Sequence, residues 1–328
     1  MYPDQTLQKK VLAEKEAPYK VRTTTLRWLN SQSKEVAEGR LWSILQHNVV
    51  AFYNLVEYVS SLPLELRMVR LGSDVLPLYT QPDWTYFWRR DDVRAFCAQK
   101  FFLVGNLARQ NGVRLSMHPG QFTVLASDRD DVVEKSIEEF EYHVDIARWM
   151  GYGVKFQDFK INVHISGRRG PQGIKDVVSR LSPEARNCLT IENDEISWGI
   201  DASLELVNDC SLVLDLHHHW VATGEYIQST DDRFKRIADS WRGVIPVIHY
   251  SISKENLWAD QDPNQLPNRD QLFDQGVNKM KLRAHSDYLW NRACNDWALS
   301  FVEVADIMVE SKAKNLSSFQ LYSRWKDK

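Results

Sequence analysis

Short apolar runs recur along the chain, and most of them end in a histidine or a carboxylate. In chain order the runs read MVRLG, VRLSMHPG, INVHISG, LTIENDE, SLVLDLHHHW, VIPVIHYS and ADIMVES. A short run that is rich in branched aliphatic residues and bounded by turn residues is typical of a strand buried in a parallel sheet. The pattern therefore predicts seven strands, and we place a further, less regular strand over residues 21–26.

Longer segments with apolar residues at helical spacing separate these runs. The predicted helices cover residues 39–61, 91–110, 131–150, 174–181, 202–207, 231–241 and 293–304, and residues 251–283 are expected to form a long loop. Strands and helices that alternate in this way form parallel βα units within one sheet. We therefore predict an α/β fold, a single TIM-type (β/α)8 barrel with an irregular or missing first strand.

The length and the polarity of the chain fit one domain. A chain of 328 residues suits one barrel of about 250 residues with insertions. Residues 1–20 are polar and rich in lysine and glutamate, so we assign them to an N-terminal tail or a peripheral helix. Residues 21–328 contain no linker, repeat or low-complexity segment, and we assign them to the barrel domain.

Composition narrows the choice of partners and of compartment. The formal net charge of −3 excludes a globally basic coat for nucleic acid, although it allows a local basic groove. The four cysteines are scattered, which favours reduced, buried thiols over disulfides. No apolar signal core opens the chain, and no stretch approaches the roughly 18 apolar residues of a membrane span. We therefore expect a cytoplasmic, intracellular protein that is not secreted and has no membrane partner.

The residues that end the apolar runs are of the kind that bind metal ions. Imidazole and carboxylate groups without thiolate suit Zn, Mn or Fe. Eight such residues exceed one tetrahedral site but suffice for two or three clustered sites, which favours metal-assisted hydrolysis or isomerisation. Buried polar groups without a partner are costly, so a shared metal is the economical explanation for those deep in apolar strands. The eight candidate ligands are His118, His164, Glu192, Asp215, His218, His249, His285 and Glu310.

The run His217-His218-His219 leaves its metal ligand undecided. Strand alternation places Asp215, His217 and His219 on one face, which favours His217. If the strand ends at Leu216, the alternation fails and His218 can turn inward. The residue pattern alone therefore keeps both His217 and His218 as candidates.

The chain resembles the UV damage endonuclease family in its segments RLSMHPGQF, NVHISG, IENDE, VLDLHHHW, IHYS, HSDYL and DIMVESKAK. The resemblance covers about residues 65–315, and HPGQ followed by an aromatic residue is a fairly specific signature. The family looks like a relative of the abasic-site endonucleases with a three-metal barrel. Its members are similar in nicking DNA immediately 5′ to pyrimidine dimers, 6-4 photoproducts and some other lesions. The resemblance implies a metal-dependent DNA repair endonuclease, a hydrolase that acts on phosphodiester bonds.

The resemblance also implies a role for most of the metal ligands. His118, His164 and Glu192 would together hold one ion. Glu192 would bridge to a second ion and belong to the catalytic set. That set, carried over motif by motif, is Glu192, Asp215, His249 and Glu310. The implied cofactors are two or three divalent metal ions, with manganese favoured and zinc as the alternative.

A third ion would rest on His218 and His285, so the resemblance selects His218 over His217. Here the chain departs from the family pattern. Val247 replaces a metal-site lysine that is expected to be carboxylated, and Gln81 stands where the family has a histidine. The family's opening strand, with a tyrosine and an asparagine that also probe the lesion, is not visible. Two neutral imidazoles offset no charge on a divalent ion, so we expect the third ion to be bound weakly.

Two groups of residues are implied to contact DNA. Gln121 and Phe122 stand where the family inserts a Gln–Tyr pair into the duplex, although packing of Phe122 within its loop is the alternative. An inserted wedge costs a few kcal/mol of unstacking and least at a damaged step, so lesions are recognised by deformability. Arg168, Arg169 and Lys254 lie in predicted rim loops, where a phosphate track requires cations. The expected partner is damaged double-stranded DNA, bound by a monomer.

The same residues allow two other interpretations of the function. A sugar isomerase or epimerase on the same barrel also uses histidine and carboxylate metal sites, although the pair His218 and His285 and the basic loops argue against it. A damage-binding protein with weakened catalysis is the second alternative, and Val247 and Gln81 favour it. Incubation with UV-irradiated and undamaged plasmid, with and without manganese, would separate the three.

Overall fold

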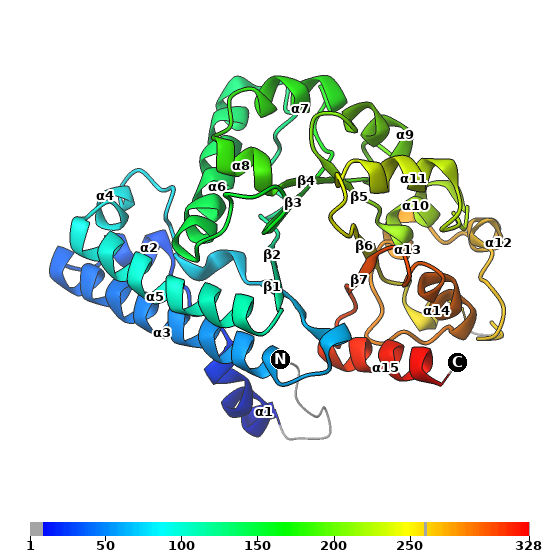
Figure 1. The fold of residues 1–328 in the computed structure, drawn as a ribbon, viewed down its shortest axis with the longest axis horizontal. Coiled ribbons are helices and arrows are strands. Elements are labelled where there is room, and N and C mark those ends of the chain that lie inside the picture. The colour runs from blue at the N-terminus through cyan, green and yellow to red at the C-terminus, as the bar shows by residue number, and fades with distance from the viewer. Residues whose placement is uncertain (1–8, 259–260, 328) are drawn as a thin grey trace.

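The computed structural model describes residues 9–258 and 261–327, and its parallel strands stand in a ring with helices outside (Figure 1). Each of the seven predicted apolar runs contains one strand of the described residues. The α/β fold predicted from the alternation of strands and helices is confirmed. The strands are β1 (Met68–Leu71), β2 (Arg114–Met117), β3 (Lys160–His164), β4 (Leu189–Glu192), β5 (Ser211–Val213), β6 (Val247–Tyr250) and β7 (Asp306–Val309).

Two parallel sheets make up the ring. The first has the order β1-β2-β3-β4-β5, and the second consists of β6 and β7. A bridge between Asp215 and His249 joins the two, and the His249 N–H donates to the carbonyl of Leu214 at 2.9 Å. In the register of β3 and β4, His164 stands beside Glu192. The carboxyl ends of all strands therefore meet at one rim, as in a β/α barrel.

Among the described residues no backbone hydrogen bonds join β7 to β1, and a seam separates these two strands. Two ion pairs cross the seam from neighbouring strands: Arg70 with Glu310, and Arg114 with Asp306, the latter at 2.5 Å. A cavity of about 410 Å³ lies at the seam, lined by residues of β1, β7, α3 (Lys34–Ser60) and α15 (Asn315–Lys326). The ring is therefore closed by side chains at this point.

The strand predicted over residues 21–26 is wrong. Residues 21–25 form no strand, and α2 (Leu26–Asn30) begins directly after them with Thr25 as its cap. The reason is that the side chain of Asn48 on α3 satisfies this backbone. The Arg22 N–H donates to Asn48 Oδ1 at 2.6 Å, and Asn48 Nδ2 donates to the Arg22 carbonyl at 2.8 Å. The side chain of Asn48 thus forms the backbone hydrogen bonds that a neighbouring strand would otherwise form with Arg22.

The helices include each predicted one, with shifts of a few residues at most ends. The predicted loop over residues 251–283 instead contains two helices, each started by an asparagine cap. The remaining helices are α1 (Lys9–Glu16), α4 (Thr85–Trp88), α5 (Asp91–Gln110), α6 (Asp130–Trp149), α7 (Gly170–Val178), α8 (Pro183–Cys188), α9 (Ile200–Ser203), α10 (Leu216–Thr223), α11 (Asp232–Asp239), α12 (Arg269–Asp274), α13 (Lys279–Leu282) and α14 (Arg292–Leu299), with 3-10 turns η1 (Ala17–Tyr19), η2 (Leu64–Leu66), η3 (Ser73–Val75), η4 (Leu204–Leu206) and η5 (Glu255–Leu257).

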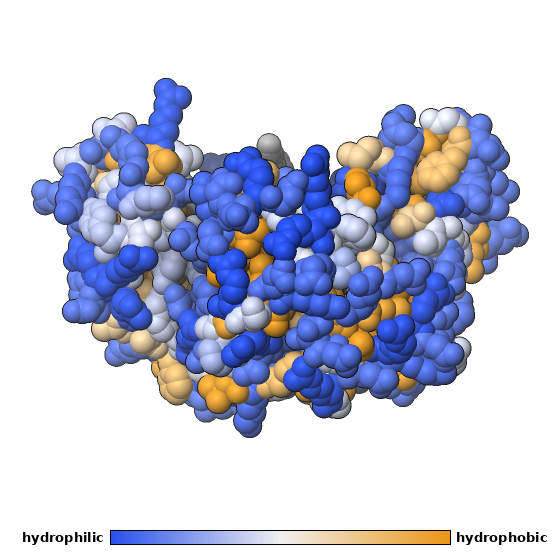
Figure 2. Space-filling view, turned by 90° about the horizontal axis from the view of Figure 1, so that it is seen from above, coloured by the Kyte–Doolittle hydropathy of each residue, from blue (hydrophilic) through white to orange (hydrophobic). Residues whose placement is uncertain are grey.

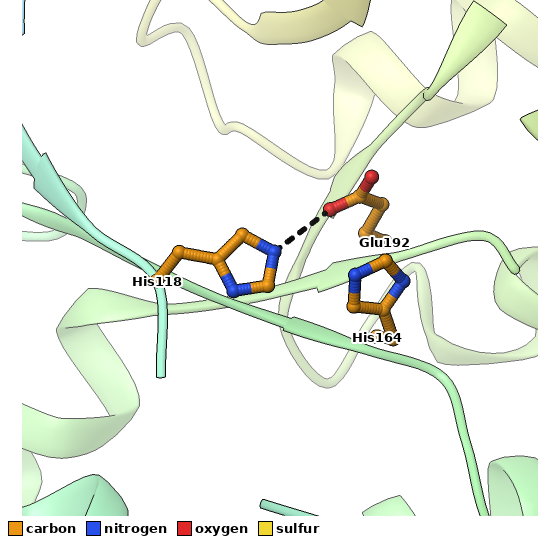
Figure 3. A group of neighbouring side chains, drawn as sticks. All are labelled: His118, His164 and Glu192. Carbon is orange, nitrogen blue, oxygen red and sulfur yellow. Dashed lines mark ion pairs between the residues drawn. The ribbon is translucent and has the colours of Figure 1, made fainter. Parts of the chain in front are cut away.

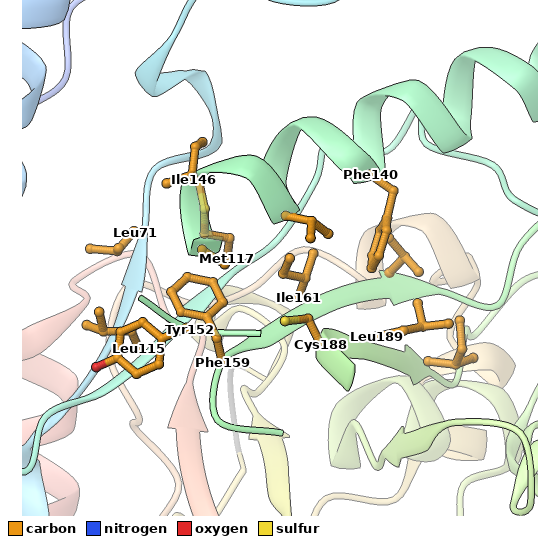
Figure 4. Close-up of a cluster of buried hydrophobic side chains, with 14 of the residues drawn as sticks. Leu71, Leu115, Met117, Phe140, Ile146, Tyr152, Phe159, Ile161, Cys188 and Leu189 are labelled. Carbon is orange, nitrogen blue, oxygen red and sulfur yellow. The ribbon is translucent and has the colours of Figure 1, made fainter. Parts of the chain in front are cut away.

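The main core lies between the strands and the helices that cover them. Figure 4 shows Phe140 and Ile146 of α6 facing Met117 and Ile161 of the sheet, and all four side chains are buried. Burial of such side chains stabilises the fold by about 1.5–3 kcal/mol each. None of the helices within the described ranges is long and apolar enough to cross a membrane. Figure 2 shows a face on which hydrophilic residues predominate and apolar residues are scattered.

Candidate metal centre

Three candidate ligands from consecutive strands converge at the carboxyl rim. His118 follows β2, His164 ends β3 and Glu192 ends β4. One ligand atom of each lies within 4.8 Å of the other two, and the His118 Nε2 is 3.5 Å from Glu192 Oε2 (Figure 3). Parallel strands with a common register bring their last residues together, which explains why side chains distant in sequence meet here.

A second group of four ligands shares Glu192 with the first. Glu192, Asp215, His249 and Glu310 each offer one ligand atom within 4.8 Å of the other three. The Nδ1 of His249 lies 3.1 Å from Glu192 Oε1 and 3.4 Å from Glu310 Oε1. One carboxylate at the junction of two ligand groups is the arrangement that a metal-bridging glutamate requires.

Hydrogen bonds to carbonyls fix which ring nitrogen each histidine can offer to a metal. The Nδ1–H of His118 donates to the carbonyl of Pro119 at 2.9 Å. In the same way, Nδ1 of His218 donates to the carbonyl of Asn193 at 3.0 Å, and Nδ1 of His285 to the carbonyl of Glu310 at 2.6 Å. In the neutral form of each ring, Nε2 is therefore the nitrogen that a metal ion could contact.

Several ligand atoms in the centre are buried and have no hydrogen-bond partner among the described residues. These atoms are His164 Nδ1, Glu192 Oε1, Asp215 Oδ2 and His249 Nδ1. The other oxygen of each carboxylate is held, since Glu192 Oε2 accepts from Asn162 and Asp215 Oδ1 accepts from the His218 N–H at 2.6 Å. Leaving a buried polar atom unpaired costs about 1–3 kcal/mol. Convergent unpaired acceptors of this kind fit divalent metal ions.

The electrostatics of the centre lead to the same conclusion. Burial raises the pKa of Glu192, but His249 and His164 outweigh it and hold that pKa well below its ordinary value. Burial raises the pKa of Asp215 well above its ordinary value, and the charges of Glu192 and Glu310 add to the effect. Carboxylates this close cannot all ionise without a compensating positive charge. A divalent cation would supply that charge.

The structure shows which of His217 and His218 lies in the metal centre. Strand β5 ends at Val213, and Asp215 caps α10, so the run of histidines lies on a helix. The cap brings His218 into the centre, where its Nδ1 is 3.4 Å from Glu192 Oε1. His217 points elsewhere, with Nε2 at 3.0 Å from Ser253 Oγ. Alternation favoured His217 because it assumed a strand that is not present.

A buried lysine that the sequence analysis missed lies beside the centre. Lys160 opens β3, and its Nζ is 2.8 Å from His249 Nε2, which leaves Nδ1 of His249 toward the carboxylates. Burial lowers the pKa of Lys160 to about 7 against the opposing charge of Glu192. Val247 forms an apolar cluster with Val213 and other residues, so it offers no ligand. Alternation in KINVH places residues 160, 162 and 164 on one face, and this signal could have identified the lysine.

Comparison with known proteins decides the family. Residues 7–327 match the model of the UV-endonuclease UvdE family. The chain belongs to this family. It is 28% identical over 293 residues to the UV-damage endonuclease of Schizosaccharomyces pombe, covering 85% of this chain and 43% of that protein. The chain thus spans less than half the length of this relative. It is 23% identical over 324 residues to the UV DNA damage endonuclease of Bacillus cereus (strain G9842), covering 92% and 87% of the two chains.

Two solved structures show the same fold. SacUVDE superposes with a TM-score of 0.70 at 24% identity and covers 94% of each chain. Endonuclease IV from Thermus thermophilus superposes with a TM-score of 0.53 at 14% identity and covers 84% of this chain and 95% of its own. The part of the chain that the structure describes therefore shares its fold with these two structures.

The residues expected to contact DNA lie on the loops after the strands and not in the metal-ligand groups. Gln121 and Phe122 are exposed in the loop that follows His118, and Phe122 is 85% exposed. Arg168 pairs with Asp128 at 3.2 Å in the loop after β3. An exposed aromatic side chain of this size has no packing role in this structure, so the packing alternative for Phe122 is not supported.

A close contact between the loop after β2 and the loop after β3 positions Arg168 and Arg169. Gly167 has φ of +98°, and a Cβ at this position would lie 2.3 Å from the carbonyl oxygen of Ala126. The N–H of Arg169 donates to that same carbonyl at 3.0 Å, and Arg169 also pairs with Asp176. Only glycine fits here, so the loop after β3 is fixed against the loop after β2. Lys254 lies after β6 as the cap of η5.

Proposed function

We propose that this protein is a metal-dependent DNA repair endonuclease that nicks DNA on the 5′ side of UV photoproducts and other helix-distorting lesions. The observation that carries the proposal is the shared position of Glu192 between two ligand groups, with the exposed Phe122 on the loop that begins at His118. Membership of the UvdE family and the names of the relatives support the same activity. Because all candidate ligands come from one chain, we propose a monomer.

The ligand groups define where the ions would be held. His118, His164 and Glu192 would hold one ion, and Glu192 with Asp215, His249 and Glu310 a second. Divalent ions in such a pair supply an activated water and stabilise the departing 3′ oxygen during displacement at phosphorus. Manganese suits this mixed set of imidazole and carboxylate ligands, and zinc is the alternative.

The protein's own contribution is to orient these ligands before substrate arrives. Asn162 holds one oxygen of Glu192, and Arg70 holds one oxygen of Glu310. Asn193 bonds both backbone polar groups of Asp215, accepting its N–H at 2.8 Å and donating to its carbonyl at 3.1 Å. Partners of this kind fix ligand orientation, and their removal typically costs roughly 10–100-fold in metal affinity or activity.

Recognition of damage would use the rim loops. Phe122 and Gln121 would enter the duplex, where a damaged step unstacks at lower cost than an intact one. Arg168, Arg169 and Lys254 would contact phosphates without reading sequence. Residues 21–328 would act as one barrel domain, with residues 1–20 as a peripheral segment.

A plasmid assay tests the proposed function against its two alternatives. Supercoiled plasmid, either UV-irradiated or undamaged, is incubated with the protein in manganese or in a chelator. We expect nicked circles only from irradiated plasmid with manganese. Retardation of irradiated plasmid without any nick would instead indicate a damage-binding protein. Absence of both effects, together with isomerisation or epimerisation of a sugar, would favour the sugar isomerase or epimerase and refute the proposal.

A further inference from the structure

A fourth carboxylate reaches the metal centre, although it does not end an apolar strand. Glu195 lies in the loop after β4, three residues beyond Glu192, and its side chain is only 2% exposed. It belongs to neither of the two ligand groups described above. A buried carboxylate requires partners for both oxygens, so its surroundings indicate what it binds.

The two oxygens of Glu195 differ in the same way as those of Glu192 and Asp215. Oε1 accepts from the Nε of Arg283, whereas Oε2 is buried and has no hydrogen-bond partner within the described part of the chain. The Nε2 of His218 lies 3.6 Å from this Oε2. Glu195 therefore repeats the pattern of the proposed ligands, with one oxygen held and one left open toward the centre.

The two atoms that face each other across this gap are too far apart for a hydrogen bond. Nδ1 of His218 donates to the carbonyl of Asn193, so the neutral ring would offer its Nε2 to a cation beside Glu195 Oε2. Two ligand atoms about 2.1 Å from one ion at a tetrahedral angle lie roughly 3.4 Å apart. The observed separation of 3.6 Å is close to that value. A cation between the two atoms would satisfy both.

The neighbouring histidine provides an internal comparison. His219, one residue along α10, also faces a glutamate that is paired with an arginine. There the two side chains form a hydrogen bond, with His219 Nε2 at 3.0 Å from Glu225 Oε2. Arg233 contacts both oxygens of Glu225. Histidine and glutamate are thus hydrogen-bonded at Glu225, whereas at Glu195 the same two residue types are not, although an arginine contacts the glutamate in both places.

We propose that Glu195 is a ligand of a third divalent-cation site, which it forms with His218 and His285. The ring centroid of His285 lies 6.5 Å from that of His218, and its Nδ1 donates to the Glu310 carbonyl, so the neutral ring would offer Nε2 to the ion. The carboxylate supplies the negative charge that two neutral imidazoles and Val247 do not. This inference rests on the proposed metal-dependent function, and it replaces the expectation of a weak third site.

Metal content measured on three variants tests the proposal. Metal-free protein is dialysed against a fixed concentration of free Mn²⁺, and bound manganese per chain is determined by elemental analysis. Glu195→Gln should lose the third ion, with its affinity lowered by at least about tenfold, the lower limit for disturbing a ligand's surroundings. Arg283→Gln should keep the third ion or bind it more tightly, because a competing cation is removed. The matched control Glu225→Gln should bind as the parent protein does.

The two charge-pair variants distinguish a ligand from a structural ion pair. If Glu195 only orders the loop through Arg283, Glu195→Gln and Arg283→Gln will lower metal content equally, which overturns the proposal. Unchanged manganese in Glu195→Gln overturns it too, even when the protein nicks irradiated plasmid with two ions bound. If the parent binds no manganese and makes no nicks, the proposed function itself fails. Should Glu195→Gln not fold, Glu195→Asp must show intermediate affinity for the third ion.

Discussion

Glu192→Gln is expected to abolish nicking of UV-irradiated DNA and to lower the metal content of the protein. Glu192 is the one residue common to both ligand groups, and its Oε1 is buried without a hydrogen-bond partner among the described residues. Glutamine has the same shape as glutamate but no charge, so the substitution should weaken the binding of both ions. Activity should fall by more than about a hundredfold, the upper end for changes that merely disturb a ligand's surroundings.

The control for this variant is a carboxylate beside a buried histidine outside the centre. Glu139 on α6 accepts from Thr80 and lies 3.9 Å from His143 Nδ1. Glu139→Gln should leave both nicking and manganese content near parental values. Full activity and parental metal stoichiometry in Glu192→Gln would show that Glu192 does not bridge two ions.

Phe122→Ala is expected to weaken binding to a duplex that contains a pyrimidine dimer by roughly 1–3 kcal/mol, the scale of one lost stacking aromatic. This corresponds to about a 5- to 150-fold higher Kd. Among the large apolar residues that the structure describes, Phe122 is the most exposed, and it follows the candidate ligand His118 by four residues. Metal content should not change, because Phe122 offers no ligand. Binding is measured by fluorescence anisotropy on a labelled duplex with one defined lesion.

An exposed phenylalanine away from the rim provides the matched control. Phe102 on α5 is half exposed and contacts Arg109. Phe102→Ala should bind the damaged duplex as the parent does. Equal affinities of Phe122→Ala and the parent protein would mean that the exposed ring does not enter the DNA.

The strands and most of the candidate ligands could be predicted from the sequence because a parallel barrel imposes simple local patterns. A buried strand is a short apolar run, and its last residue must face the rim, which identified His164 and Glu192 directly. The helix from Asp91 to Gln110 was predicted to the residue. Here local sequence and tertiary structure agree, so no knowledge of distant contacts was needed.

The errors arose where distant contacts decide the structure. Residues 21–25 resemble a strand, but Asn48, 26 residues away from Arg22, satisfies their backbone groups instead. Strand alternation favoured His217 because the residue pattern does not reveal that Asp215 caps a helix. Both outcomes depend on a side chain that bonds the backbone, and hydrophobic periodicity carries no information about such bonds.

Two charged residues near the centre were missed for different reasons. Lys160 was predictable, since it alternates with His164 along one strand face, but a lysine at the start of an apolar strand ordinarily marks its solvated end. Glu195 was not predictable from spacing, because it lies in a loop whose course brings it back toward His218. Its hydrogen-bond partner Arg283 is 88 residues further along the chain.

We propose that divalent ions held by this cluster make the chain a damage-specific endonuclease. This proposal is tested most directly with a duplex that contains one pyrimidine dimer and a label on the 5′ end of the damaged strand. The protein is stripped of metal, shown by elemental analysis to be metal-free, and then titrated with Mn²⁺. We expect one cut immediately 5′ to the dimer, with a yield that rises with bound manganese, and no cut in the presence of chelator. Equal cutting of the undamaged duplex, or cutting by the metal-free protein, would contradict it.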